Sequence, residues 1–163
     1  MNGVKLTLRA LHHGERALER RLLAVAQRHR TEHEIHHVSR DLARWSREHA
    51  ARLAEQGRHY GLDLSGPAGH LPADALAVLR ERAAVAMGRR REAGLLLLHD
   101  LRSLYLSAAG NSVHWEMLAQ TAQATKDTGL LALVSSCHPQ TLRQVRWANT
   151  MIKNLAPQLL SGL

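Results

Sequence analysis

The chain has little of the material from which sheets are built. Its 163 residues include no phenylalanine, three tryptophans and two tyrosines. Valine, isoleucine and threonine are also few, whereas alanine, leucine and arginine dominate. This composition favours helices over strands. Because the length suits one domain with a hydrophobic core, we expect a single all-α domain over residues 1–163.

Cysteine and long apolar runs are nearly absent. Cys137 is the only cysteine, which excludes a disulfide framework and a metal site made of several thiolates. Residues 1–11 lack the apolar core of a signal peptide, and the densest apolar run, 95–98, is too short to span a bilayer. We therefore expect a soluble cytoplasmic protein.

Acidic residues are fewer than basic ones, and the formal net charge is +8 with histidine neutral. A basic balance permits contact with nucleic acid or with an anionic surface, but it does not show such contact. A basic nucleic-acid-associated protein is therefore one function to consider. We expect any such binding to be weak and nonspecific.

Apolar residues recur every three or four positions through most of the chain, which is the spacing of amphipathic helices. This spacing predicts long helices over about residues 4–28, 31–60, 92–126 and 139–160. Thr31 and Glu34 form a capping box that predicts the start of the second helix. Pro139 suits the first turn of the fourth. Residues 128–136 are predicted to be a short helix or a turn.

The connection between the second and third predicted helices is long. It contains a loop rich in glycine and proline at 65–69, a predicted short helix at 73–87 and three consecutive arginines at 89–91. A simple up-down-up-down bundle needs only short loops, whereas a connection of this length can cross the whole bundle. We therefore predict a four-helix bundle with a long crossover that carries a short extra helix.

A polar residue interrupts each of the four apolar stripes near its middle. These residues are Glu15, His49, Glu116 and Asn149. The third stripe is predicted to contain Leu98, Leu101, Tyr105 and Ser112, and the fourth Leu142, Val145 and Ile152. A carboxylate on a core face costs several kcal/mol unless it is paired, protonated or bound to metal. At about 1.5 Å per residue the four polar residues match in height, which predicts one mid-bundle polar layer.

Three short motifs around these residues resemble the ferritin-like superfamily, and in particular its small, stress-associated bacterial branch. They are Leu-His-His-Gly-Glu at 11–15, Arg-Glu-His-Ala-Ala-Arg-Leu at 47–53 and Val-His-Trp-Glu at 113–116. The resemblance implies a ferritin-like four-helix bundle with a long crossover and a link to bacterial stress response. It also implies a di-metal site, which this superfamily builds from a Glu on each of two helices and a Glu-x-x-His on each of the other two.

The chain departs from that ligand pattern at several positions. Ser46 stands where the second helix should supply a bridging Glu, and Val113 replaces one Glu of the third helix. Val145 and Asn149 occupy the slots of the fourth helix where acidic ligands are expected. Two remaining carboxylates balance the charge of two iron ions poorly in a core of low dielectric. A functional di-iron oxidase or ferroxidase is therefore not expected.

Two interpretations of Glu15, His49 and Glu116 stay open. In the first they form a structural polar layer with Asn149, without a cofactor, and fix the register of the helices. In the second they hold one divalent ion, Fe, Mn or Zn, with water completing the ligands, in a metal-binding protein with or without oxidase activity. We predict the first, a non-catalytic interaction or scaffold protein with no catalytic residue.

Several other residues deserve an interpretation. His29, His33, His36 and His37 surround the first helix–helix turn and are predicted to form a solvated, basic helix end. Cys137 is predicted to lie in a turn without an acidic partner, so we do not expect it to act as a nucleophile.

Two tryptophans lie beside the predicted apolar stripes. Trp115 and Trp147 are therefore predicted at helix boundaries or at a subunit interface, together with neighbouring arginines. Apolar residues of this size are rarely left on the surface of a monomer, so we predict a symmetric homodimer with an unknown further protein partner.

Overall fold

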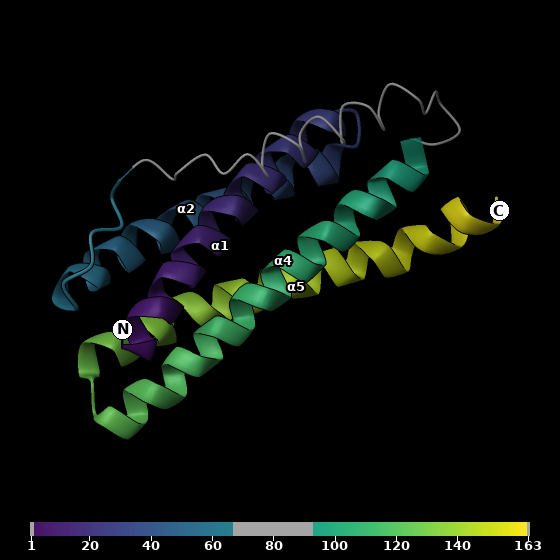
Figure 1. The fold of residues 1–163 in the computed structure, drawn as a ribbon. Helices are drawn as coiled ribbons and strands as arrows, with labels where there is room; N and C mark the ends of the chain where they lie inside the picture. Colours follow the sequence, from purple (N-terminus) through teal and green to yellow (C-terminus); the bar gives the residue numbers. More distant parts are fainter. Residues whose placement is uncertain (1, 67–92, 163) are drawn as a thin grey trace.

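A computed structural model of the chain describes residues 2–66 and 93–162. Within these ranges the protein consists of four long helices and no strand (Figure 1). They are α1 (Gly3–Arg28), α2 (His33–His59), α4 (Ala93–Thr125) and α5 (Thr128–Ser161). The prediction of an all-α four-helix protein is confirmed. None of these helices combines the length and the apolar character that crossing a membrane requires.

Two predicted segments lie outside the described residues. They are the short helix at 73–87 and the three arginines at 89–91. The described helices nevertheless fix where the chain leaves and re-enters the bundle. Tyr60, directly after α2, donates a hydrogen bond from its hydroxyl to Asp127 in the α4–α5 turn. Gly94, at the start of α4, lies beside Leu159 near the end of α5. The end of α2 and the start of α4 therefore lie at opposite ends of the bundle.

Helix packing follows from this arrangement. α1 packs on α2 and α4 packs on α5, and the two pairs meet through α1 with α4 and α2 with α5. Each pair is antiparallel, whereas α2 and α4 run in the same direction (Figure 1).

The capping-box prediction for α2 is wrong. The N-cap is Glu32, and its side chain makes no capping hydrogen bond. The reason is a tight turn after α1, in which the Glu32 N–H donates to the His29 carbonyl at 2.9 Å. This turn places Thr31 outside the helix, so its hydroxyl is one residue too early to cap. The predicted end of α2 near Gly61 is close to the observed one. Gly61 adopts a φ of +70°, which favours glycine and does not continue a helix.

The predicted helix start at Pro139 is also wrong. α5 begins eleven residues earlier, at Thr128, and continues through Pro139. Asp127 supplies the N-cap, since its carboxylate accepts from the Leu130 N–H at 2.9 Å. Cys137 consequently lies inside the helix and not in a turn. A proline removes one backbone donor from a helix, but long packed helices tolerate that loss.

The predicted core face is right for α1 and shifted for α4 and α5. On α1 the predicted stripe, with Glu15 in its middle, is buried. On α4 the buried residues are Leu97, Asp100, Leu101, Leu104, Ala108, Asn111, Trp115, Leu118 and Ala122. On α5 they are Leu130, Leu133, Val134, Cys137, Thr141, Gln144, Ala148 and Met151. α4 has apolar residues on most of its sides, so a stripe displaced by one position also looks apolar in the sequence.

The buried apolar side chains form two clusters along the bundle. One contains Leu8, Leu11, Leu53 and Leu118, and it includes the body of Trp115. The other contains residues such as Leu18, Leu22, Leu42, Leu101 and Ala148. On α1 the two clusters are about two turns apart, between Leu11 and Leu18, and Glu15 lies between them.

Candidate functional site

Glu15 is the carboxylate at the centre of the bundle. Its side chain is 0% exposed, and it lies on the core face of α1. Next to it on α1, a Cβ added at Gly14 would lie 2.2 Å from Asn111 Oδ1 on α4. A glycine at position 14 therefore leaves room for the Asn111 side chain beside the buried carboxylate.

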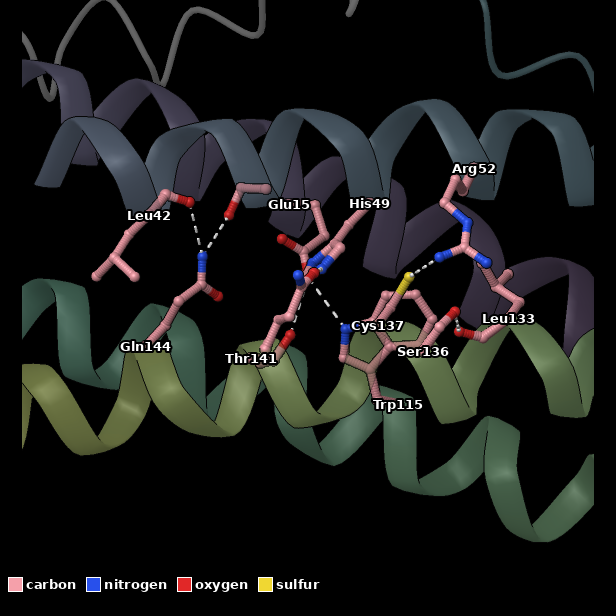
Figure 2. Close-up of polar contacts among 12 residues, drawn as sticks. Glu15, Leu42, His49, Arg52, Trp115, Leu133, Ser136, Cys137, Thr141 and Gln144 are labelled. Carbon is pink, nitrogen blue, oxygen red and sulfur yellow. Dashed lines mark hydrogen bonds and ion pairs between the residues drawn. The ribbon is translucent and has the colours of Figure 1, made fainter. Parts of the chain in front are cut away.

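One oxygen of Glu15 is contacted from the other three helices (Figure 2). Oε1 accepts a hydrogen bond from Trp115 Nε1 on α4 at 3.0 Å. The Thr141 hydroxyl on α5 donates to the same oxygen at 3.5 Å. Nδ1 of His49 on α2 lies 3.2 Å from it. We call Glu15, His49, Trp115 and Thr141, together with Gln140, the central layer.

His49 is oriented from both sides of its ring. The side chain is 1% exposed, and its Nε2 lies 2.7 Å from Oε1 of Gln140. Both ring nitrogens thus face oxygen atoms, and the tautomer decides which of them donates. The Trp115 ring meets the His49 ring edge-to-face, with centroids 5.8 Å apart. The geometry therefore suits a buried, hydrogen-bonded pair of a carboxylate and a histidine.

Further buried polar groups continue along the bundle. Gln144 on α5 donates from Nε2 to the Leu42 carbonyl at 3.0 Å and to the Ser46 hydroxyl at 2.9 Å, both on α2. Within the described ranges, three buried atoms of this region have no hydrogen-bond partner, namely Glu15 Oε2, Asn111 Nδ2 and Gln144 Oε1. Each such atom retains unused bonding capacity in the core.

The structure brings together two of the three predicted metal ligands. Glu15 and His49 are adjacent, whereas the Glu116 side chain is 59% exposed on the outside of α4. Glu116 accepts from Gln120 at 3.1 Å and lies 3.9 Å from His138. Asn149 is only half-buried. The predicted layer is therefore wrong in these two members. For Glu116 the stripe of α4 was placed one position away from its true core face, and for Asn149 the height along the bundle was counted from Pro139, whereas α5 begins at Thr128.

The residues that replace them were missed in the sequence. Trp115 and Thr141 take the places assigned to Glu116 and Asn149, and Trp115 is 0% exposed. Trp115 was predicted at an interface, but it is the main N–H donor to Glu15. From the sequence alone, either Trp115 or its neighbour Glu116 could lie on the core face of α4.

The donor set around Glu15 fits a hydrogen-bonded carboxylate better than a metal ligand. Across residues 2–66 and 93–162, no group of three or more His, Cys, Asp or Glu side chains lies close enough to hold an ion. Glu15 and His49 alone offer two ligands, and Oε1 of Glu15 already faces the Trp115 N–H at 3.0 Å. A donor N–H competes with a cation for the same lone pairs.

A second buried carboxylate, Asp100 on α4, was not predicted at all. Arg28 donates to both of its oxygens at 3.0 Å, and Nε2 of His29 lies 2.7 Å from Oδ2. Burial raises the pKa of Asp100, but the hydrogen bonds from His29 and Arg28 outweigh it, so the pKa is lowered overall. The prediction that His29 belongs to a solvated helix end is therefore wrong, because His29 is buried in this ion pair.

The remaining histidines of that turn and the cysteine have structural partners. The His36 Nδ1 lies 2.8 Å from the Ala26 carbonyl, and the rings of His33 and His37 lie 4.4 Å apart. Cys137 is buried, and Arg52 donates to its sulfur at 3.5 Å (Figure 2). Burial raises the pKa of the Cys137 thiol, which disfavours the reactive thiolate.

The chain was compared with known proteins at three levels. No protein-family model, no curated protein sequence and no solved structure matches it.

Proposed function

We propose that the protein is a non-catalytic, ferritin-like helical bundle with an interaction or scaffold role, in which a hydrogen-bonded layer stands where the superfamily has metal. The observation that supports this most strongly is the environment of Glu15. Its carboxylate accepts from Trp115, faces the ring of His49 and contacts Thr141. The resemblance of the sequence motifs adds the proposed link to bacterial stress response.

The directions of the helices support the ferritin-like part of the proposal. α2 and α4 run in the same direction, and the chain leaves α2 at one end of the bundle and enters α4 at the other. Ferritin-like bundles have one long crossover of this kind, whereas up-down-up-down bundles do not.

The burial of the central layer supports a non-catalytic role. The side chains of Glu15 and His49 are 0% and 1% exposed. A substrate does not reach these two side chains in this conformation, and an apolar cluster lies on either side of them along the bundle. General acid–base chemistry needs its acid and base within hydrogen-bond reach of the substrate.

A second candidate function rests on one specific observation. Glu15 Oε2 is buried, and no hydrogen-bond partner for it exists in the part of the chain that the structure describes. A single divalent ion, Fe, Mn or Zn, bound by Glu15 and His49 would use this oxygen. Such an ion would need further ligands, and Glu116 does not face this point, so we rank this metal-binding function below the first.

A double-mutant cycle on Glu15 and His49 tests the proposal. His49→Leu leaves the Glu15 carboxylate buried without the ring that faces it, and we expect it to cost about 3 kcal/mol of unfolding free energy. Adding Glu15→Leu removes the stranded charge, so the double variant should be more stable than His49→Leu alone. Urea denaturation at neutral pH measures both.

The matched control is an ion pair on the surface. Arg47 donates to Glu19 at 2.7 Å, and the Arg47 side chain is largely exposed. Arg47→Leu should therefore cost less than about 1 kcal/mol. Additive costs for Glu15→Leu and His49→Leu would contradict the proposed pairing.

A further inference from the structure

The outward side of α4 is unusual for a helix on a bundle surface. We define the outer face of α4 by its exposed residues at helical spacing, namely Leu95, His99, Arg102, Leu106, Gly110, Val113, Met117, Gln120 and Ala124. Its four large apolar members are between 47% and 61% exposed. A helix that is apolar on its outward side as well as its inward side is normally covered on both.

Charge is distributed unevenly between this face and the rest of the molecule. α1 and α2 carry charged side chains on nearly every turn, mostly arginine. The charged residues of α4 are Asp100, Arg102 and Glu116 alone, and Asp100 is buried. Two copies of a chain with a net charge of +8 would repel each other through α1 and α2. The outer face of α4 lacks this repulsion.

Gly110 lies in the middle of the outer face, and no contact or backbone angle within the described chain requires a glycine there. A Cβ added there would meet nothing within 4 Å, and its φ is not positive. Glycine inside a helix costs about 0.5–1 kcal/mol relative to alanine. Close approach by a second helix is a physical use for a glycine at an exposed position.

The order of residues along the outer face suits a second copy of the same face. About a midpoint between Ala109 and Gly110, Leu106 lies as far on one side as Val113 lies on the other. The same holds for Leu95 and Ala124. Two antiparallel copies related by a two-fold axis at this midpoint would place Leu106 of each copy against Val113 of the other, with the small residues Ala109 and Gly110 at the crossing.

The two exposed charges on α4 fit the same axis. At about 1.5 Å per residue, Arg102 and Glu116 lie about 11 and about 10 Å on either side of the midpoint. An antiparallel pair would therefore bring Arg102 of each chain beside Glu116 of its partner, twice by symmetry. Opposite charges at matching heights favour this pairing, whereas a parallel pair would place like charges side by side.

We infer that the outer face of α4 is the interface of an antiparallel, two-fold symmetric homodimer, centred between Ala109 and Gly110. The inference concerns the outside of the bundle, and it stands whether or not the central layer binds an ion. It also replaces the predicted role of Trp115 at an interface, because Trp115 lies in the core.

Sedimentation of the full chain tests the interface. We expect a dimer at about 100 μM and a monomer for Val113→Glu, because a buried unpaired charge opposes association. Val113 is exposed within one chain, so the circular dichroism of the variant should stay helical. The control is Leu23→Glu on α1, which is also exposed and should leave the dimer intact. A monomeric wild type, or a dimer that survives Val113→Glu, would overturn the inference.

Charge exchange tests the axis. Arg102→Glu and Glu116→Arg should each weaken association about tenfold, and the two together should restore it. Single variants that associate as tightly as the wild type would show that these residues do not meet.

Cross-linking tests the direction of the partner. In a Cys137→Ser background, an equal mixture of Leu106→Cys and Val113→Cys chains should form more disulfide-linked dimer than either chain alone. A parallel pair would give the reverse result, with each variant cross-linking to itself. That outcome, or cross-linking by a Leu23→Cys control, would contradict the antiparallel α4 interface.

Discussion

At the scale of single residues, Trp115 is the main neutral hydrogen-bond donor to Glu15. Trp115→Phe keeps most of the ring but removes the N–H that Glu15 accepts at 3.0 Å. Hydrogen bonds to buried charged groups contribute roughly 1.5–3 kcal/mol, so we expect a loss of about 2 kcal/mol in unfolding free energy. Urea denaturation of the full chain measures it.

Trp147 offers a matched control for that substitution. Its Nε1 is buried, but it has no hydrogen-bond partner in the ranges that the structure covers. Trp147→Phe therefore removes an N–H that makes no hydrogen bond, and it should lower the unfolding free energy clearly less than Trp115→Phe does. Equal losses at the two positions would mean that the Trp115 hydrogen bond contributes no stability.

Asp100 should make the stability depend on pH. Hydrogen bonds from His29 and Arg28 lower its pKa from the ordinary value of 3.8 against the opposing effect of burial. A lowered pKa in the folded state means that the carboxylate stabilises the fold above pH 3.8 and that this contribution is lost as the pH falls further. Asp100→Asn should therefore cost about 2–3 kcal/mol at neutral pH and less at lower pH.

Unfolding of Asp100→Asn by urea across a pH series checks this. Asp41 serves as the control, because it pairs with Arg44 on the exposed side of α2. Asp41→Asn should change the unfolding free energy by less than about 1 kcal/mol at every pH. A cost of Asp100→Asn that grows as the pH falls would have the wrong sign for the ion pair.

At the scale of helices, α5 carries a local cost at Pro139. A proline inside a helix removes one backbone hydrogen bond and costs about 3 kcal/mol relative to alanine. Pro139 is exposed, so a smaller side chain leaves no cavity. Pro139→Ala should raise the unfolding free energy by about 1–3 kcal/mol.

Pro157, in the last turns of α5, is the control for that gain. Helix ends contribute less stability than helix centres, so Pro157→Ala should gain less than Pro139→Ala. Guanidinium denaturation of both variants compares them. Destabilisation by Pro139→Ala would show that the packing of α5 depends on the proline.

The helices also show which features could be predicted from the sequence. The core face of α1 was clear, because its polar side is full of arginine and glutamate and only one stripe is apolar. α4 offers almost no such contrast, so Glu116 was predicted on the core face and Trp115 beside it, whereas Trp115 is the buried residue. The start of α5 was missed because Pro139 is a stronger sequence signal than the single capping residue Asp127.

The partners of the central layer could not have been read from spacing alone. Gln140 and Thr141 depend on how α5 is rotated against α2, and this rotation is decided by packing across the whole bundle. The same holds for Asp100, whose partners lie 71 and 72 residues away in the chain. Contacts between distant segments leave no local pattern in one sequence.

At the scale of the whole molecule, the described surface has an arginine-rich side on α1 and α2 and a largely apolar side on the outer face of α4. Among the residues that the structure describes, arginines concentrate on α1 and α2, so contact of this part with an anionic partner such as nucleic acid would involve that side. We keep the prediction that such binding is weak, nonspecific and strongly reduced by salt. Arg102 is the one Arg, Lys, Asp or Glu residue on the outer face of α4, which we propose for contact between copies.

The central claim is that hydrogen bonds, and not an ion, stabilise the buried Glu15–His49 pair. Its most direct test is the metal content of protein purified without nickel resin, measured together with the melting temperature before and after a strong chelator. The account predicts no stoichiometric ion and an unchanged melting temperature, because no bound metal contributes to folding. One ion per chain, with a melting temperature that falls on chelation in the wild type but not in Glu15→Leu/His49→Leu, would contradict it.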